Sequence, residues 1–163
     1  MKVKASTHYK VKCFDKFGRF KWREEFDNLV TIAGLNKLLD ATFVTGLTSP
    51  EWWVGLVGVT HTFVAEDTLS SHTGWAENAH YSGNRKTLTL GAISGGSVNN
   101  IASKAIFTMA GTSNPDTING CFLCDAETGT SGTLYGEGDF SIPRILIDGD
   151  IVNVEIILQN TAA

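Results

Sequence analysis

The N-terminal segment K-V-K-A-S-T-H-Y-K-V-K-C-F alternates polar and apolar residues with a period of two. In an extended strand, successive side chains point to opposite faces, so this pattern predicts a half-buried β-strand. The turn sequence D-K-F-G follows, and R-F-K-W-R resumes the alternation with Phe20 and Trp22 expected inward. We therefore expect residues 1–27 to form an N-terminal hairpin or arm. The inward side of its first strand carries Val3, Ala5, Thr7, Tyr9, Val11 and Cys13.

The rest of the chain predicts a single, mainly β domain covering residues 1–163. The chain has 163 residues, a length that suits one core rather than two. After Pro50, short strand-like segments alternate with Gly-rich turns. The chain shows no strand–helix–strand alternation, which is the pattern that would indicate a parallel sheet. We expect a jelly roll or β-sandwich of about eight antiparallel strands.

One helix is expected near residues 32–43, in the sequence T-I-A-G-L-N-K-L-L-D-A-T-F. Thr31 can cap its first turn, and Gly34 should weaken that turn slightly. An apolar stripe at helical spacing should cover one edge or open end of the core. The stripe consists of Leu35, Leu38, Leu39 and Thr42.

Charge is distributed unevenly along the chain. The net charge is −4, but residues 1–25 carry eight Lys and Arg against three acids, whereas residues 116–163 carry eight acids against Arg144 alone. We expect the basic strand, through Lys2, Lys4, Lys10 and Lys12, to meet an acidic protein partner or a neighbouring copy. A solvated basic strand face explains the same pattern equally well. The acidic balance argues against direct nucleic-acid binding.

Three cysteines and the absence of an apolar signal core favour a soluble protein made in a cytoplasm. The spacing C-F-L-C suits redox or zinc chemistry, but no second pair accompanies it. Buried strand cysteines are the favoured interpretation. No apolar run is long enough to cross a membrane.

The richest polar cluster is E-D-T-L-S-S-H-T-G-W-A-E-N-A-H-Y, residues 66–81. His61, His72 and His80 supply metal-binding nitrogens, but their spacing matches no compact ligand motif. Alternatively the segment is a long ordered loop, in which Asp67 caps a turn through Thr68 to His72 and Trp75 anchors the excursion. Arg85 would then pair with Glu77 or Glu66.

Other chemistries have weaker signals. The hydrolase motif G-x-S-x-G and the phosphate-binding glycine motifs are missing. The tryptophans with Tyr81 provide material for a sugar-stacking platform, although core positions suit most of them better.

The stretch D-T-L-S-S-H-T-G-W-A-E, followed by Tyr81 and Arg85, resembles part of the capsid cement or decoration proteins of tailed bacteriophages. W-W-V-G-L-V before it, and K-A-I-F-T-M, I-N-G-C-F-L, S-G-T-L-Y and G-D-F-S-I-P-R-I-L-I-D-G-D-I-V-N-V after it, extend the resemblance over most of the chain. The resemblance implies a jelly-roll protein on the outer capsid surface of a virion, assembled in the bacterial host cytoplasm. It also implies a structural role, with no enzymatic activity, no cofactor and no membrane association.

Three functions therefore remain open: a capsid decoration protein, a tail or baseplate protein that binds host carbohydrate through Trp75 or Tyr81, and a metal-dependent enzyme using the histidines. We favour the first, with the major capsid protein as partner. We expect a homo-oligomer, a trimer first and a dimer second. The candidate assembly contacts are Lys2, Lys4, Lys10, Lys12, Asp67, His72, Trp75, Glu77, Tyr81 and Arg85.

Overall fold

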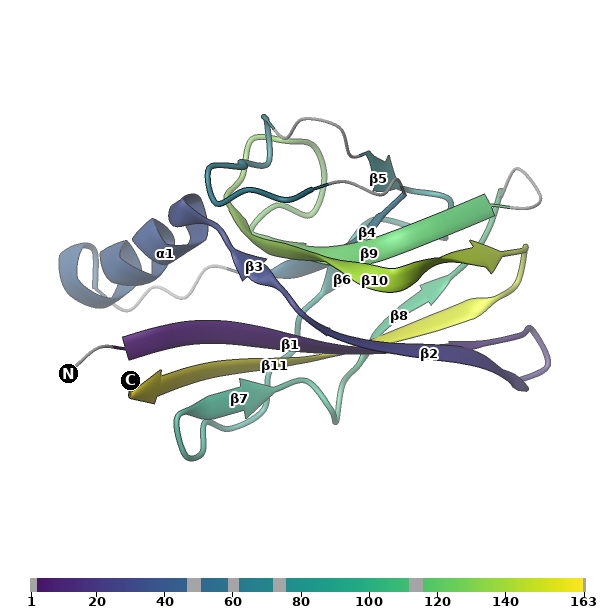
Figure 1. Ribbon diagram of the computed structural model, residues 1–163, viewed down its shortest axis with the longest axis horizontal. Coiled ribbons are helices and arrows are strands. Elements are labelled where there is room, and N and C mark those ends of the chain that lie inside the picture. The colour runs from purple at the N-terminus through teal and green to yellow at the C-terminus, as the bar shows by residue number, and fades with distance from the viewer. Residues whose placement is uncertain (1–2, 47–50, 59–61, 72–75, 112–115, 163) are drawn as a thin grey trace.

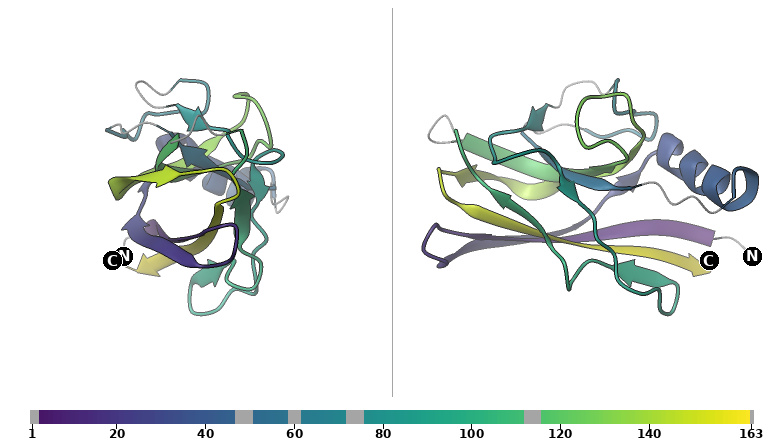
Figure 2. Two further views of the ribbon diagram at one scale, coloured as in Figure 1. Left: turned by 90° about the vertical axis from the view of Figure 1, so that its right-hand side faces the viewer. Right: turned by 180° about the vertical axis from the view of Figure 1, so that it is seen from behind.

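The protein is a β-sandwich of two antiparallel sheets with one helical segment at its end (Figure 1). The computed structural model describes residues 3–46, 51–58, 62–71, 76–111 and 116–162. Seen end-on, the two sheets face each other as separate layers (Figure 2, left). The predicted mainly β fold is confirmed.

The first sheet has the order β2-β1-β11-β7, and β8 also pairs with β11. Strands β1 and β11 pair along their whole lengths, from Val3 with Ala162 to Phe14 with Ile151. The two ends of the chain therefore lie side by side (Figure 1). The strands are β1 (Val3–Phe14), β2 (Phe20–Asp27), β7 (Ser97–Asn99), β8 (Ala105–Thr108) and β11 (Ile151–Ala162).

The second sheet has the order β3-β10-β9-β4-β5, and β6 also pairs with β4. The described residues form eleven strands rather than about eight, because several short pairings lie in segments that look like turns in the sequence. The strands are β3 (Leu29–Val30), β4 (Trp53–Val57), β5 (Glu77–Asn78), β6 (Lys86–Thr87), β9 (Asp116–Cys124) and β10 (Leu134–Leu146).

The predicted N-terminal hairpin is confirmed, with one correction at Phe20. Tyr9, Val11 and Cys13 are buried between the sheets, as the alternation predicts. However, Cys13 pairs with Trp22 whereas Phe14 pairs with Phe20, so a β-bulge inserts one extra residue into β2. The bulge moves Phe20 to the outer face, where it is 58% exposed and packs against the Phe14 ring.

The predicted helix begins as expected but buries less apolar surface than expected. Helix α1 (Ile32–Leu39) continues as a π-helical turn, η1 (Asp40–Val44). The Thr31 hydroxyl accepts a hydrogen bond from the Gly34 N–H at 3.0 Å, which confirms the cap. Leu38 packs against the core, but Leu35 and Leu39 are exposed, so the predicted stripe is only partly buried. The helical segment lies at one end of the sandwich (Figure 2, right).

Candidate functional site

The best-defined polar cluster joins the loop after β5 to the rest of the second sheet. The Arg85 guanidinium donates from Nε to Glu77 Oε1 at 2.9 Å and from Nη2 to Glu77 Oε2 at 2.7 Å. The Arg85 side chain is 5% exposed and that of Glu77 is 26% exposed. Such two-bond pairing is the strongest geometry for these groups. It confirms the predicted ion pair, with Glu77 rather than Glu66 as the partner.

The same guanidinium also holds the turn that follows β9. Its Nη1 and Nη2 donate to the carbonyls of Ala126 and Gly129, each at 2.9 Å. Its central carbon lies 5.2 Å from the centre of the Phe122 ring. Arg85 thus connects three segments, and its directional donors are used within the domain.

Tyr81 completes this cluster and links the two sheets. Its hydroxyl donates to Glu77 Oε1 at 3.3 Å, and its ring packs edge-on to Phe107 of β8. Tyr81 also forms an isolated backbone bridge with Met109, just after β8. Burial, reinforced by the Glu77 carboxylate, raises the pKa of Tyr81 well above its ordinary value. The hydroxyl therefore stays a hydrogen-bond donor at every physiological pH.

Asp67 supports the loop in a different way from the one predicted. Its carboxylate accepts from the Val64 N–H at 3.2 Å, whereas the turn 68–71 is capped by the Thr68 hydroxyl, which accepts from the Ser71 N–H. The apolar anchor in the described part of the loop is Leu69, which is 1% exposed. Leu69 was not among the predicted anchors, although it is the one large apolar residue between Glu66 and Ser71. The proposed anchor, Trp75, lies outside the described residues.

Burial corrects part of the predicted assembly surface. Asp67, Tyr81 and Arg85 are each at most 7% exposed and bond within the domain, so they fold the loop instead of facing a partner. Glu77 is partly exposed but is held by Arg85. His72 and Lys2 lie outside the described residues. The buried ring of Tyr81 does not present a face to a sugar.

Of the three histidines predicted as possible metal ligands, His80 alone lies within the described residues. His80 Nδ1 lies 2.6 Å from Asp116 Oδ2, and Asn78 donates to the same oxygen at 2.9 Å. His61, like His72, lies outside the described residues. Within the described ranges, no three His, Cys, Asp or Glu side chains gather as a metal site.

The basic strand face meets acids of its own sheet. Lys10 lies between Glu25 of β2 and Glu155 of β11, and Lys12 lies between Arg23 and Asn153. Lys4 is opposite Thr161 near the end of β1. Because Lys10 lies between two acids on the neighbouring strands, part of the charge difference along the chain is balanced inside the fold.

The cysteines occupy buried positions, as favoured from the sequence. Cys13, Cys121 and Cys124 are free thiols in the core-facing parts of β1 and β9. Burial raises the pKa of Cys13 to about 12 and raises that of Cys121 further. Thiols in this state are poor nucleophiles and poor metal ligands.

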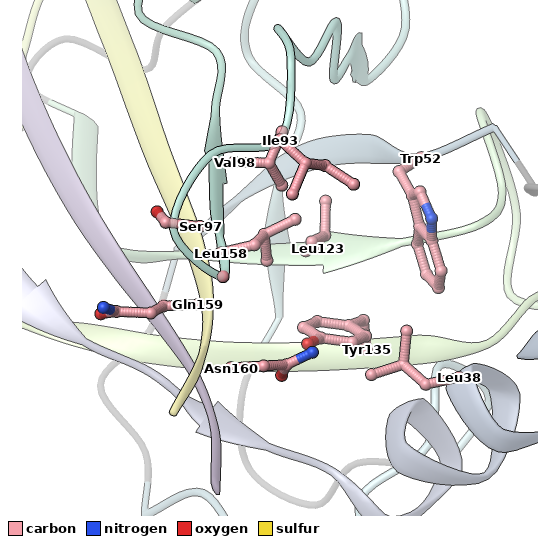
Figure 3. A pocket seen from close by; sticks show the side chains of 11 residues that line it. Leu38, Trp52, Ile93, Ser97, Val98, Leu123, Tyr135, Leu158, Gln159 and Asn160 are labelled. Atoms are coloured by element: carbon pink, nitrogen blue, oxygen red, sulfur yellow. The ribbon is translucent and has the colours of Figure 1, made fainter. Parts of the chain in front are cut away.

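An apolar pocket of about 240 Å³ opens between the sheets beside α1 (Figure 3). Trp52 and Tyr135, with ring centres 5.4 Å apart, form its aromatic wall, and Gln159 and Asn160 contribute polar groups. No carboxylate, histidine or basic side chain is among the described lining residues. Its volume is below that of a typical small-molecule site.

The most prominent exposed feature is the apolar face of α1 and η1. Its large side chains are between 40% and 78% exposed and recur at helical spacing. We call this set the helix patch; it consists of Ile32, Leu35, Leu39, Phe43 and Val44. Two of these five residues, Leu35 and Leu39, belong to the stripe predicted from the sequence, which was expected to be covered by the core.

Comparison with known proteins adds no assignment: no protein-family model matches the chain, and no curated protein matches it. Among the described residues, no helix has the length and apolar character needed to cross a bilayer.

Proposed function

We propose that this chain is a virion structural protein that binds the outside of an icosahedral phage capsid and stabilises the shell. The sequence resemblance around D-T-L-S-S-H-T-G-W-A-E supports the proposal. The nested pairing of β1 with β11 in one sheet and β3 with β10 in the other is compatible with a jelly roll. The proposed role is structural and non-enzymatic.

The observation that carries the proposal is the exposed helix patch. Monomeric soluble proteins rarely present a continuous row of large apolar side chains, and such rows usually mark protein contacts. Here Phe43 and Val44 are each 78% exposed at the end of the domain. The major capsid protein is the proposed occupant, because a shell repeats the same surface many times. Several weak contacts on one lattice then add to a firm attachment.

Quantitative mass spectrometry of purified virions tests the role directly. Copy numbers equal to the major capsid protein, or a simple fraction of it, are expected for a decoration protein. A few copies per particle would favour the tail or baseplate alternative. Absence from the virion would overturn both structural roles.

A binding assay with shells lacking this protein tests the surface. Leu39→Ser and Phe43→Ser are expected to weaken shell binding, because each removes exposed apolar area from the helix patch. Ile106→Ser is the matched control, since Ile106 is 51% exposed on β8. Strand β8 lies away from the helix patch (Figure 1). Equal loss with all three variants would contradict the assignment of the helix patch.

A further inference from the structure

Strand β2 forms an open edge of the first sheet. Among the described strands it pairs with β1 alone, and after Asp27 the chain crosses into β3 of the second sheet. Figure 1 shows β2 running along the front of the sandwich, beside β10. An exposed edge of this kind offers unpaired N–H and C=O groups to another strand.

The alternation of hydrogen-bonded pairs between β1 and β2 identifies which backbone groups of β2 face the open edge. The Asn28 N–H donates to the Thr7 carbonyl at 3.0 Å, so residues 7 and 28 form a hydrogen-bonded pair. Hydrogen-bonded and non-hydrogen-bonded pairs alternate in an antiparallel ladder. Trp22, Glu24 and Phe26 therefore bond to β1, whereas Arg23 and Glu25 direct their backbone groups to the open edge.

The side chains of Arg23 and Glu25 are complementary to a second copy of themselves. Both are exposed on the outer face of the sheet. Within the chain Arg23 lies opposite Lys12, a like-charge neighbour, and Glu25 lies opposite Lys10. In an antiparallel pair of two β2 strands centred on Glu24, each Arg23 faces the other copy's Glu25. A register shifted by two residues would place Arg23 opposite Arg23 of the other copy, or Glu25 opposite Glu25 of the other copy. Like charges would then face each other.

The two central Glu24 carboxylates do not repel each other strongly in this arrangement. Its side chain turns into its own sandwich and is 6% exposed. Its carboxylate accepts hydrogen bonds from Arg144 Nε at 2.8 Å and from the Ser141 hydroxyl at 2.9 Å. Each of the two carboxylates nearest the symmetry axis is therefore already paired with a cation.

Apolar surface lies on the same side of the sandwich. The bonds from Glu24 to Ser141 and Arg144 hold this part of β10 next to β2. Ile142 and Ile145 of that segment are 53% and 60% exposed. A second copy docked along β2 would approach both side chains and bury part of this area.

We infer that two copies of this chain associate through antiparallel pairing of their β2 edges, with Arg23 of each copy facing Glu25 of the other. The contact is isologous, so it closes as a twofold dimer. This corresponds to the second of the two oligomer sizes expected from the sequence. The inference does not depend on a role in the virion.

A charge-reversal cycle with the full chain tests the dimer, with mass measured by light scattering after size exclusion. The unaltered protein is expected to be dimeric, and Arg23→Glu and Glu25→Arg are each expected to shift it to monomer. The double variant, Arg23→Glu with Glu25→Arg, should restore the dimer because the charges are exchanged. Lys16→Glu, the same charge change at the exposed hairpin turn, should leave the dimer intact.

Hydrogen exchange provides the second measurement. The Arg23 and Glu25 amides are expected to be protected in the unaltered protein and to exchange faster in Arg23→Glu, while the Trp22 amide stays protected in both. Circular dichroism of each variant checks that it is folded. A monomer at the highest soluble concentration, a trimer, or a dimer that Arg23→Glu leaves intact would each overturn the inference.

Discussion

Arg85 and Glu77, eight positions apart, form a two-bond ion pair with a buried guanidinium, and this pair closes the loop after β5. The carboxylate end of the pair also accepts from Tyr81, and the guanidinium end holds the carbonyls of Ala126 and Gly129. The cluster thus ties the loop, the turn after β9 and the first sheet together. The polar groups of this cluster therefore stabilise the fold.

Removing Arg85 is expected to destabilise the domain strongly. Arg85→Ala leaves Glu77 and two carbonyls without their partner, and breaking a buried pair of this kind costs about 3 kcal/mol. Arg85→Lys should recover little, because an ammonium cannot reproduce the planar fork of donors. Urea unfolding measures the change. Lys104→Ala removes a partly exposed pair with Glu155 that is held by one longer contact of 3.4 Å, and it should cost less, about 1 kcal/mol. Similar losses for Arg85→Ala and Lys104→Ala would contradict this assignment.

Gly34→Ala is expected to destabilise the protein, although alanine normally favours a helix by about 1 kcal/mol. A Cβ at position 34 would clash with the Tyr135 carbonyl oxygen and lie 2.7 Å from the Tyr135 Cα, so α1 would have to move away from β10. Overpacking of this kind costs about 1–3 kcal/mol. Thermal unfolding should show a lower midpoint for Gly34→Ala than for Gly91→Ala, whose Cβ would meet Asn99 at an ordinary 3.5 Å. A stabilised Gly34→Ala would show that α1 is not closely packed.

The neighbouring leucines Leu38 and Leu39 are expected to respond very differently to alanine. Leu38 packs against the core and lines the pocket, so Leu38→Ala should cost about 2 kcal/mol. Leu39 is 56% exposed, and Leu39→Ala should change stability by less than about 0.5 kcal/mol. Chemical denaturation of both variants measures the difference. A large loss for Leu39→Ala would mean that the helix patch is covered in solution.

Acid stability should depend on Asp116. Burial alone raises the pKa of Asp116, but hydrogen bonds from Asn78, His80 and the Thr117 N–H outweigh it and hold that pKa below its ordinary 3.8. Because the folded state favours the charged carboxylate, this contribution is complete above the ordinary pKa and is lost as pH falls through the lower folded pKa.

The free energy of unfolding of the unaltered protein should therefore fall from about pH 5 downward, with Asp116→Asn showing a shallower fall. Urea titrations at several pH values measure both slopes. Glu66→Gln, which alters an exposed carboxylate, is the control. Parallel slopes for the unaltered protein and Asp116→Asn would remove Asp116 from the explanation.

Prediction from the sequence succeeded where a pattern depends on neighbouring residues. The alternation placed Tyr9 and Val11 in the core, and the polar residue before an apolar helical run placed the cap at Thr31. Phe20 shows the limit, because one bulged residue reverses the facing of everything beyond it. The pairing of Arg85 with Glu77 was also accessible, since the two residues flank one loop.

The sequence by itself determined that the N-terminal segment is extended, where the helix begins and which face of β1 is buried, because these follow from local backbone geometry and side-chain period. Only the tertiary structure decided that β1 pairs with β11, that Gly34 meets Tyr135 and that Arg85 holds Ala126 and Gly129. These contacts join residues far apart in the chain, so they depend on how two complete sheets pack. The same packing leaves the helix patch and the β2 edge uncovered.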